Sequence, residues 1–440
     1  MTYYEAEQFI LGLNNLRDSN ISDQHKSSRN LKRVQFLLDI LKNPEKKIPH
    51  YIHVTGTSGK GSVCTFLHSI LCASGKATGL LISPHQTKMT ERWKIGKMNM
   101  SDSEFIALVK ELRQALQIYI RTSPYEMLSF LDITTVIGFL YFAKHKVDWA
   151  IIEIGCGGRF DSTNIIPWKD AAVITNVGLD HTDILGKTKE EIAKNKSGII
   201  QKQCKVFTME SDPKIVSIIK KECTKKKAKL HVIGDEYTIL ENNLCGTIFE
   251  YKQKQYTLPI LGEHQIKNAV LCIEMAQILG FSLGQIAKGL QQVKQPLRME
   301  LILQKPLLIL DGAHNEDKIK TTVQTLLAIL PHMRPTPNIH VIACFPPKKN
   351  WGAMIQALSQ LHPKTIACTR DNLHAFRKVA HPKSVLSVFQ KYIKSSLVKV
   401  FIDPEEAYLW SKKQAKTSDI ILATGSIYSS GELRKLLKQD

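Results

Sequence analysis

The sequence predicts an α/β protein of two domains, the first with a mostly parallel sheet and a phosphate-binding loop, the second smaller. A β-prone run over residues 51–55 leads through Gly-Thr-Ser-Gly-Lys-Gly-Ser into a helical pattern that starts at Ser62. Beyond Pro296, five short apolar runs alternate with helical segments, which is typical of a parallel sheet with helical crossovers. We therefore expect domains at residues 1–295 and 296–440.

The composition is that of a globular protein without membrane spans. Of the 440 residues, 43% are hydrophobic and 23% are charged, which is enough to bury a sizeable core. No stretch has 18 uncharged apolar residues, and the first residues are polar rather than signal-like. The nine cysteines lack CxxC spacing, so we expect reduced thiols and no zinc site. We expect a cytoplasmic protein with no membrane partner.

The net charge of +20 has three interpretations: nucleic-acid binding, attraction of small polyanions such as ATP and polycarboxylates, or solvated surface lysines. The basic residues are spread out, with clusters only over residues 220–229 and at Lys348-Lys349. There is no RNA-binding aromatic signature and no helix-turn-helix spacing. We expect no nucleic-acid partner, and a nucleic-acid-dependent ATPase is kept as an alternative.

The phosphate-binding loop is predicted at residues 56–62. Backbone N–H groups at a strand–helix turn and the helix dipole attract phosphate, and Lys60 adds a cation. The Walker A spacing is not met, because Val54 stands where glycine is required and Gly61 directly follows the lysine. Ser62 supplies the hydroxyl group one position later. The alternative interpretation is a tight turn with a surface lysine.

Polar residues also follow the next strands. Ser83 opens a polar run after one strand, and Glu153 lies between isoleucines at the end of another. A buried carboxylate needs a cation or hydrogen bonds, so a magnesium site, direct or through water, is favoured over a salt bridge. His181, beside Asp180, follows a further strand, where both a ligand role and a structural role remain open.

Periodicity and capping signals predict the other elements. Helices are expected at residues 4–16, 31–41, 101–116 and 129–144, from 188, from 262, and in a segment that ends near 293. Capping boxes are expected at Ser101 with Glu104 and at Thr188 with Glu191. Strands are expected at residues 77–83, 147–154, 171–176, 307–310, 339–344, 365–369, 398–402 and 420–424, at both ends of 205–233, and as short antiparallel strands within 237–260. Residues 17–29 form a polar loop and residues 294–298 the domain junction.

Taken together, these motifs resemble the folylpolyglutamate synthase/dihydrofolate synthase family of the Mur ligase superfamily, over about residues 30–434. The matching segments are 53–62, 83–85, 91–92, 153–164, 178–181, 196–199, 264–265 with Asn268, Arg298 with Glu300, 311–315 and 424–426. The resemblance implies an N-terminal ATPase domain and a Rossmann-like C-terminal domain.

The resemblance also implies site residues. ATP would be bound by Thr57, Ser58, Gly59, Lys60, Gly61, Ser62, Asn268, Arg298, Asp311 and His314. Two magnesium ions would be served by Ser62, Ser83, Glu153 and His181. Lys196 would be a metal-bridging carbamate, and Lys60, His181 and Lys196 would be catalytic. The pterin would contact Arg29, Asn30, Leu31, Ser129, Phe130, Leu131, Asp132, Phe160, Asp161 and Ser162.

The chain departs from the family pattern at five of these positions or their neighbours. Ser58 replaces a usual asparagine, Cys156 replaces leucine or isoleucine, and Leu297 replaces a common glycine. Asn30 and Lys32 stand where glycine and glutamate are frequent. No expected metal ligand is missing, and Leu297 predicts a stiffer hinge before Arg298.

The activity implied by the resemblance is that of an ATP-dependent acid–amino-acid ligase. It would add L-glutamate to dihydropteroate, to the glutamyl tail of folates, or to both, through an acyl phosphate, in folate biosynthesis and one-carbon metabolism. We expect a monomer. The alternative is a Mur-type ligase of peptidoglycan precursors, but only about 50 residues precede the loop, too few for a UDP-binding domain.

Overall fold

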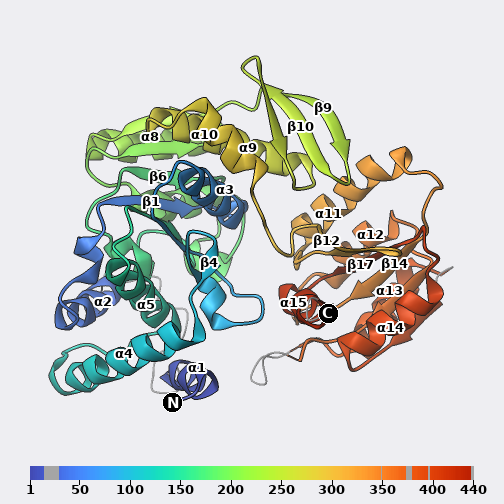
Figure 1. Cartoon of the computed structure of the whole chain (residues 1–440), viewed down its shortest axis with the longest axis horizontal. Helices are drawn as coiled ribbons and strands as arrows, with labels where there is room; N and C mark the ends of the chain where they lie inside the picture. Colours follow the sequence, from blue (N-terminus) through green and yellow to red (C-terminus); the bar gives the residue numbers. More distant parts are fainter. Residues whose placement is uncertain (14–28, 348, 373–378, 395–396, 438–440) are drawn as a thin grey trace. The chain divides into compact units, whose positions relative to one another are not determined.

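The computed structural model describes residues 1–13, 29–347, 349–372, 379–394 and 397–437. They form two compact units (Figure 1). The first comprises Met1–Glu236 and Lys267–Gln292, and the second comprises Tyr237–Ile266 and Val293–Asp440. The second unit therefore includes residues 237–266, which a single cut after residue 295 would assign to the first domain. Most of the predicted polar loop 17–29, and Lys348, lie outside the described residues.

An eight-stranded sheet is the centre of the first unit. Its order is β4 (Met98–Asn99), β3 (Trp93–Ile95), β2 (Thr78–Leu81), β5 (Trp149–Glu153), β1 (His50–Thr55), β6 (Ala171–Ile174), β7 (Lys205–Thr208) and β8 (Lys229–Val232). Neighbours from β2 to β8 are parallel, and β3 and β4 add an antiparallel edge. This mostly parallel sheet confirms the expected fold class. The β3–β4 hairpin escapes prediction because strands of three and two residues carry no clear alternation.

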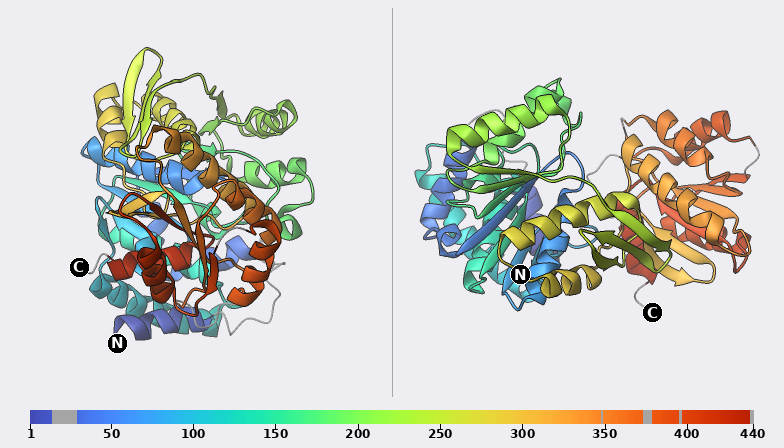
Figure 2. Two further views of the ribbon diagram at one scale, coloured as in Figure 1. Left: turned by 90° about the vertical axis from the view of Figure 1, so that its right-hand side faces the viewer. Right: turned by 90° about the horizontal axis from the view of Figure 1, so that it is seen from above.

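The helices of the first unit cover both faces of this sheet (Figure 2). They are α1 (Tyr3–Gly12), α2 (Arg29–Ile40), α3 (Lys60–Ala73), α4 (Asp102–Thr122), α5 (Phe130–Lys144), α6 (Thr182–Leu185), α7 (Lys189–Lys196), α8 (Pro213–Lys226), residues 267–278 of α9 (Glu263–Ile278), and α10 (Leu283–Gln291). The short 3₁₀ helices are η3 (Pro44–Lys47), η4 (Met89–Arg92), η5 (Ser162–Ile165) and η6 (Ser197–Ile199). One face carries α5, α7 and α8, and the other carries α3 with α10.

Both predicted capping boxes are present, at Ser101 with Glu104 and at Thr188 with Glu191. Helix α4 ends at Thr122 and not at the predicted residue 116, because apolar residues such as Tyr119 continue its buried stripe. No helix among the described residues is long and apolar enough to span a bilayer.

The second unit contains two sheets. The smaller one is antiparallel, with β9 (Thr238–Asn243), β10 (Gly246–Tyr251) and β11 (Lys254–Leu258) in the order β11-β10-β9. The larger one has the order β12 (Glu300–Gln304), β13 (Leu307–Leu310), β17 (Ile420–Thr424), β14 (Ile339–Ala343), β15 (Thr365–Cys368) and β16 (Leu397–Val400). All neighbours from β13 to β16 are parallel, and β12 is an antiparallel edge. The five predicted strands are present, and β12 adds to them.

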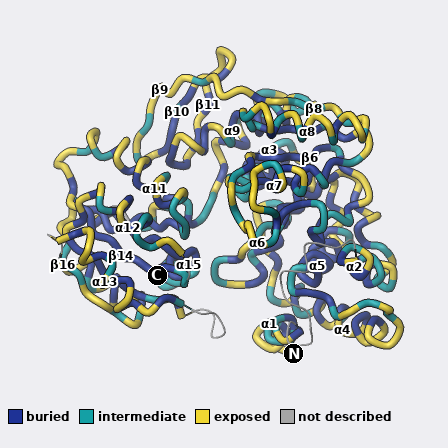
Figure 3. Tube along the Cα trace, turned by 180° about the vertical axis from the view of Figure 1, so that it is seen from behind, coloured by how far each residue is buried: buried dark blue, intermediate teal, exposed yellow. Residues whose placement is uncertain are grey.

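In the described part of the second unit, the helices after residue 293 are α11 (Glu316–Ile329), η7 (Leu330–His332), α12 (Trp351–Ser359), α13 (Pro382–Tyr392), α14 (Pro404–Gln414) and α15 (Ile427–Leu437). One face of the sheet packs on α11, α12 and α13, and the other on α14 and α15. Figure 3 shows buried strands between helices that expose their outer sides. The arrangement is the expected Rossmann-like one, in which ligands bind at the carboxyl ends of the strands.

Candidate active site

The phosphate-binding loop joins β1 to α3, and two of its glycines are dictated by geometry. A Cβ atom on Gly56 would collide with the Thr175 side chain. Gly59 is the N-cap of α3 and has φ +79°, in the left-handed region. The loop can therefore approach β6 closely and turn sharply into the helix, which leaves the first N–H groups of α3 for an anion.

Residues that follow β6 hold this loop in place. Asn176 Oδ1 accepts hydrogen bonds from the backbone N atoms of Thr57 at 3.2 Å and Ser58 at 2.9 Å. The Thr57 hydroxyl donates to Gly178 O at 3.1 Å and accepts from Gly178 N at 2.8 Å. Thr175 Oγ1 donates to Ser58 O at 2.5 Å. The loop is thus fixed by protein contacts, and Asn176 is a positioning residue that sequence reasoning overlooked although it ends a predicted strand.

Lys60 and Asn268 approach the loop from two elements. Lys60 Nζ donates to Gly56 O at 3.0 Å, so its ammonium group lies over the loop. Asn268 of α9 lies so close to Gly59 that a Cβ atom there would be 2.7 Å from the Asn268 Oδ1 atom. The structure therefore brings together all the predicted ATP residues of the first unit, which are Thr57, Ser58, Gly59, Lys60, Gly61, Ser62 and Asn268.

Glu153 places a carboxylate beside the same turn. It ends β5, where it is paired with Val54 of β1, and it is 5% exposed. Its Oε2 atom accepts from Ser83 N at 2.9 Å, and both oxygens would lie 3.7 Å from a Cβ atom on Gly61. Glu153, Ser83 and the buried Ser62 supply hard oxygen donors of the type that magnesium prefers.

His181 has a different environment. Its side chain is 53% exposed, its Nε2 atom lies 3.8 Å from Asp180 Oδ2, and its φ is +48° at the start of α6. Within the described part of the chain, no three His, Cys, Asp or Glu side chains form a metal-binding group. Magnesium commonly keeps several waters and binds one or two carboxylates plus substrate phosphates. The donors around Glu153 fit that pattern, and the metal role of His181 stays a prediction.

Lys196 is buried at the end of α7, with 3% exposure. Burial, and then the charge of Lys60, lower the pKa of its ammonium group to about 7. The neutral amine, which is the form that reacts with carbon dioxide, is therefore accessible near physiological pH. Nearby Cys156 is a poor nucleophile, because burial raises the pKa of its thiol to about 12.

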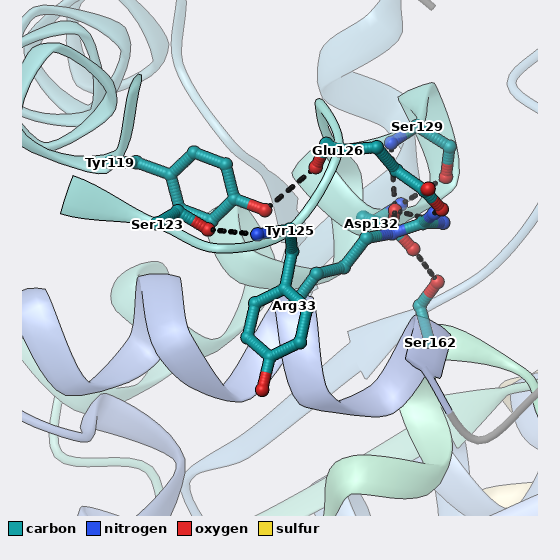
Figure 4. A network of polar contacts seen from close by, with 8 residues as sticks. All are labelled: Arg33, Tyr119, Ser123, Tyr125, Glu126, Ser129, Asp132 and Ser162. Atoms are coloured by element: carbon teal, nitrogen blue, oxygen red, sulfur yellow. Dashed lines mark hydrogen bonds and ion pairs between the residues drawn. The ribbon is translucent and has the colours of Figure 1, made fainter. Parts of the chain in front are cut away.

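Six of the predicted pterin residues line one pocket, together with Arg33. The lining is made by Asn30, Arg33, Ser129, Leu131, Asp132, Phe160 and Ser162. Figure 4 shows the polar network of this pocket, in which Arg33 Nη1 also lies 3.0 Å from Glu126 Oε1. Ser162 donates its hydroxyl hydrogen to Asp132 Oδ1, and Ser129 N donates to Asp132 Oδ2 at 2.7 Å. Arg33 is not among the predicted pterin residues, although its position in the apolar stripe of α2 indicates that it is buried.

The other four predicted pterin residues are not among the described residues that line this pocket. Arg29 is exposed, whereas Leu31 and Phe130 are half-buried. Asp161 is buried, and its carboxylate accepts from Cys156 N at 2.9 Å and from Thr163 N at 3.0 Å. Asp161 therefore shapes the loop that carries Phe160 and Ser162 to the pocket.

In the second unit, Asp311 follows β13 and organises a turn. Its oxygens accept hydrogen bonds from Met299 N at 3.1 Å, Ala313 N at 3.0 Å and Thr322 Oγ1 at 2.7 Å. A Cβ atom on Gly312 would be 3.1 Å from Arg298 Nη1. The predicted nucleotide residues Arg298 and Asp311 thus belong to one turn, in which the Asp311 carboxylate is occupied by protein donors.

His314 completes this turn. Its Nδ1 atom lies 2.9 Å from Gly312 O, and its Nε2 atom lies 3.2 Å from Lys318 Nζ. Burial, followed by the charge of Lys318, lowers the pKa of His314 to about 3. The imidazole is therefore neutral at physiological pH.

Comparisons with known proteins identify the family to which the chain is similar. The family model of the Mur ligase middle domain matches residues 54–276, and that of the Mur ligase glutamate ligase domain matches residues 297–427. The chain is 32% identical over 422 residues to the dihydrofolate synthase/folylpolyglutamate synthase of Bacillus subtilis (strain 168), which covers 93% of this chain and 95% of that protein.

Two solved structures are similar over the full length. The crystal structure of folylpolyglutamate synthase from Thermotoga maritima has a TM-score of 0.84 and 25% identity, over 99% of this chain and 96% of that one. A complex of FPGS with AMPPCP has a TM-score of 0.80 and 26% identity, over 100% of both chains.

Proposed function

The chain belongs to the folylpolyglutamate synthase/dihydrofolate synthase family of the Mur ligases, and on this basis we propose that it joins L-glutamate to a pterin substrate in an ATP-dependent reaction. The acceptor is dihydropteroate, the glutamyl tail of folates, or both, since the name of the Bacillus subtilis relative includes both synthases. The observation that carries the proposal is the preformed loop around Lys60 beside the buried carboxylate of Glu153, in a chain that matches both Mur ligase domains.

The chemistry follows from the groups present. A carboxylate is a poor acyl donor, so the substrate carboxylate first attacks the γ-phosphate of ATP, giving an acyl phosphate and ADP. Lys60 and the N–H groups at the start of α3 stabilise the negative charge on the transferred phosphoryl group. The amino group of L-glutamate then attacks the acyl carbon, phosphate leaves, and an amide bond forms.

We propose that Glu153, Ser62 and Ser83 hold magnesium, with His181 as a further candidate ligand, at two sites. Bound magnesium would supply positive charge to the phosphates. Lys196 is suited to carbamylation because its neutral form is accessible near pH 7. A carbamate would turn this buried cation into an anion able to bridge cations. In the second unit, Arg298, Asp311 and His314 remain proposed nucleotide contacts.

We propose that the pterin binds at the pocket lined by Arg33, Asp132 and Ser162. Arg33 is already paired with Asp132, so the pocket presents fixed side chains to a flat heterocycle. We still expect a monomeric, cytoplasmic protein. Sedimentation at several concentrations tests whether it is a monomer.

The test is ADP release by the purified protein with MgATP and L-glutamate, with 7,8-dihydropteroate or tetrahydrofolate in separate reactions. Turnover with both would establish both activities, and turnover with one would define the acceptor. Turnover with neither, by folded protein that binds ATP, would overturn the proposal. A parallel reaction with RNA or DNA in place of the pterin tests the nucleic-acid-dependent ATPase, and only ATP turnover stimulated by nucleic acid would favour it.

A further inference from the structure

A buried lysine that the motifs did not indicate connects two segments of the first unit. Lys169 lies between η5 and β6 and is 7% exposed. Its Nζ atom donates hydrogen bonds to Asn164 Oδ1 at 2.7 Å and to Ile199 O at 2.7 Å. The first acceptor belongs to η5 and the second to η6, so one side chain joins two short helices that are separated in the sequence.

Each of the two joined segments carries predicted site residues. The pocket loop, residues 158–165, brings Phe160 and Ser162 to the pocket proposed to bind the pterin. The Lys196 turn, residues 195–199, carries the buried lysine that is proposed to form a carbamate. A shift of one segment against the other would therefore change the distance between this pocket and Lys196.

The pocket loop and the Lys196 turn are tightly packed against each other. A Cβ atom on Gly198 would lie only 2.4 Å from Arg159 Cβ, so a larger residue has no room there. The amide group of Asn164 adds to the link, because its Nδ2 atom donates to Arg159 O at 3.1 Å and to Gly198 O at 3.2 Å. Asn164 and Lys169 therefore connect the two segments through side-chain hydrogen bonds.

The backbone next to Lys169 is fixed to the sheet. Asp170 N donates to Tyr51 O at 3.0 Å, and Asp170 Oδ2 accepts from Tyr51 N at 2.9 Å. On the other side, Lys205 N donates to Asp170 O at 3.2 Å. Because Tyr51 belongs to β1 and Lys205 to β7, the side chain of Lys169 extends from a rigid base to the two segments.

The link does not require a positive charge on Lys169. Burial lowers the pKa of its ammonium group to about 7, so the neutral amine is accessible near that pH. A neutral amine has two N–H donors, and the structure provides two acceptors, Asn164 Oδ1 and Ile199 O. Both protonation states can therefore make both hydrogen bonds, and the neutral state avoids the cost of burying a charge.

We propose that Lys169 is a positioning residue for ligation, which holds the pocket loop at a fixed place relative to the Lys196 turn. The inference rests on the proposed function. Lys169 is not among the described residues that line the pocket, so it would act through Asn164 and Ile199 and would touch no substrate. A misplacement of about 1 Å by a residue outside the site can lower a rate about 100-fold, which is why such a link matters to turnover.

The kinetic test compares Lys169→Met with the unmodified enzyme, using whichever of 7,8-dihydropteroate and tetrahydrofolate it ligates. We expect kcat/KM for the pterin substrate to fall at least about tenfold, through a raised KM and a lowered kcat. KM for ATP should change less than about twofold, because Asn176 and Thr175 hold the phosphate-binding loop. Lys205→Met is the matched control, since Lys205 Nζ also donates to a backbone carbonyl, Ile278 O at 3.2 Å, but to neither segment. It should leave these constants unchanged.

Asn164→Ala tests whether the two side chains act through one link. Each single variant should lower kcat/KM for the pterin substrate, and Lys169→Met with Asn164→Ala should lose no more than about twofold beyond the larger single effect. Losses that multiply would show independent actions and would overturn the inference. Unchanged kcat and KM in folded Lys169→Met, or an equal loss in Lys205→Met, would overturn it as well.

Amide hydrogen exchange tests the link independently of turnover. Arg159 N donates to Asn195 O at 3.0 Å, which joins the pocket loop to the Lys196 turn. This amide should exchange at least about tenfold faster in Lys169→Met, and at an unchanged rate in Lys205→Met. Equal protection in Lys169→Met and the unmodified protein would contradict the proposed link. If Lys169→Met does not fold, Asn164→Ala serves for both measurements.

The proposed function and the positioning role can fail separately. An unmodified protein that ligates no pterin substrate would overturn the proposed function, whereas the exchange rate of the Arg159 amide still decides whether Lys169 holds the two segments together. An active unmodified enzyme with an equally active Lys169→Met variant would overturn the positioning role alone.

Discussion

Arg33 and Asp132 form a buried ion pair in which two guanidinium nitrogens share one carboxylate oxygen. Arg33 Nε lies 2.7 Å and Nη2 2.6 Å from Asp132 Oδ2, and the side chains are 2% and 1% exposed. The same oxygen accepts from Ser129 N, which makes Asp132 part of the capping box of α5. One carboxylate therefore joins α2 to the start of α5 and forms a wall of the pocket proposed to bind the pterin.

Removing the positive partner should destabilise the first unit. Arg33→Met leaves the Asp132 carboxylate buried without its charge partner, which typically lowers the free energy of unfolding by about 3–5 kcal/mol. Urea denaturation measures the change. Arg113→Met is the control, since Arg113 is exposed on α4 and should change stability by less than about 1 kcal/mol. Equal losses in the two variants would contradict a special role for the pair, and Arg33→Met with Asp132→Leu should recover part of the stability.

Lys60 should be needed for chemistry and not for folding. Its ammonium group makes one hydrogen bond, to Gly56 O, and the loop is held by Asn176 and Thr175 without it. We expect Lys60→Ala to lower kcat for ADP release at least about 100-fold, as loss of a charge-stabilising group does, with the melting temperature nearly unchanged. Exposed Lys76→Ala is the control. A Lys60→Ala protein that does not fold would indicate a structural turn instead of a phosphate site.

Lys196 should reduce stability while it supports activity. Its pKa is lowered to about 7 in the folded chain, against an ordinary value of 10.5. Between pH 7 and pH 10.5, Lys196 is protonated in the unfolded chain and neutral in the folded chain, so the free energy of unfolding rises with pH over this range. Below pH 7 the side chain is protonated in both states, and the folded chain bears the full cost of the buried charge. Lys196→Met should therefore be more stable than the unmodified protein at pH 6–7 and inactive, which chemical denaturation at several pH values and ADP release will show.

The control for this prediction is Lys194→Met, because Lys194 lies two residues earlier on α7 and is exposed. It should change neither stability nor activity. With ¹³C-bicarbonate, a carbamate resonance should appear for the unmodified protein and for Lys194→Met but not for Lys196→Met. A carbamate signal that persists in Lys196→Met would assign the adduct to another amine.

Features formed by residues close together in the chain could be predicted from the sequence, whereas contacts between residues far apart in the chain could not. The phosphate-binding loop and Glu153 were found because a strand end, a glycine-rich turn and a helix start are neighbours in the chain. The Arg33–Asp132 pair joins residues 99 positions apart, and no local pattern announces it. The pterin role of Asp161 stays a prediction, and in the structure its carboxylate accepts nearby backbone N–H groups, as a short carboxylate beside a turn readily does.

The same reasoning explains the second unit. Four of the five predicted strands, β13, β14, β15 and β17, have apolar runs that are buried on both faces. The fifth, β16, is a mostly exposed edge strand, and the unpredicted β12 is an antiparallel edge strand with a register shift. His314 was predicted from its motif, but its contact with Lys318 was not, because a contact between a loop side chain and one in the following first helical turn depends on rotamers that the sequence does not specify.

At Leu297, substitution by glycine should destabilise the protein less than substitution by alanine. Leu297 has φ +56°, in the left-handed region, and its side chain is fully buried. Leu297→Ala keeps the unfavourable backbone conformation and opens a cavity, with an expected loss of about 2–5 kcal/mol. Leu297→Gly opens the same space but relieves about 1–2 kcal/mol of backbone strain. The glycine variant should therefore unfold at higher urea concentration than the alanine variant, and the reverse order would show that the backbone is unstrained.

Glu45 should make the fold less stable at neutral pH. Its side chain lies in η3 with no exposed surface, and burial raises the pKa of its carboxyl group above the ordinary 4.5. For an acid with a raised pKa, the folded chain holds the proton more tightly than the unfolded chain. The stability from this group is fully present below pH 4.5 and is lost as pH rises through the folded-state pKa.

Glu45→Gln removes the titration and keeps a similar shape, so it should raise the free energy of unfolding by about 1–3 kcal/mol at pH 8. The gain should vanish near pH 4, and exposed Glu241→Gln should show no gain at either pH. A Glu45→Gln protein less stable than the unmodified one at pH 8 would mean that the ionised carboxylate is compensated inside the fold.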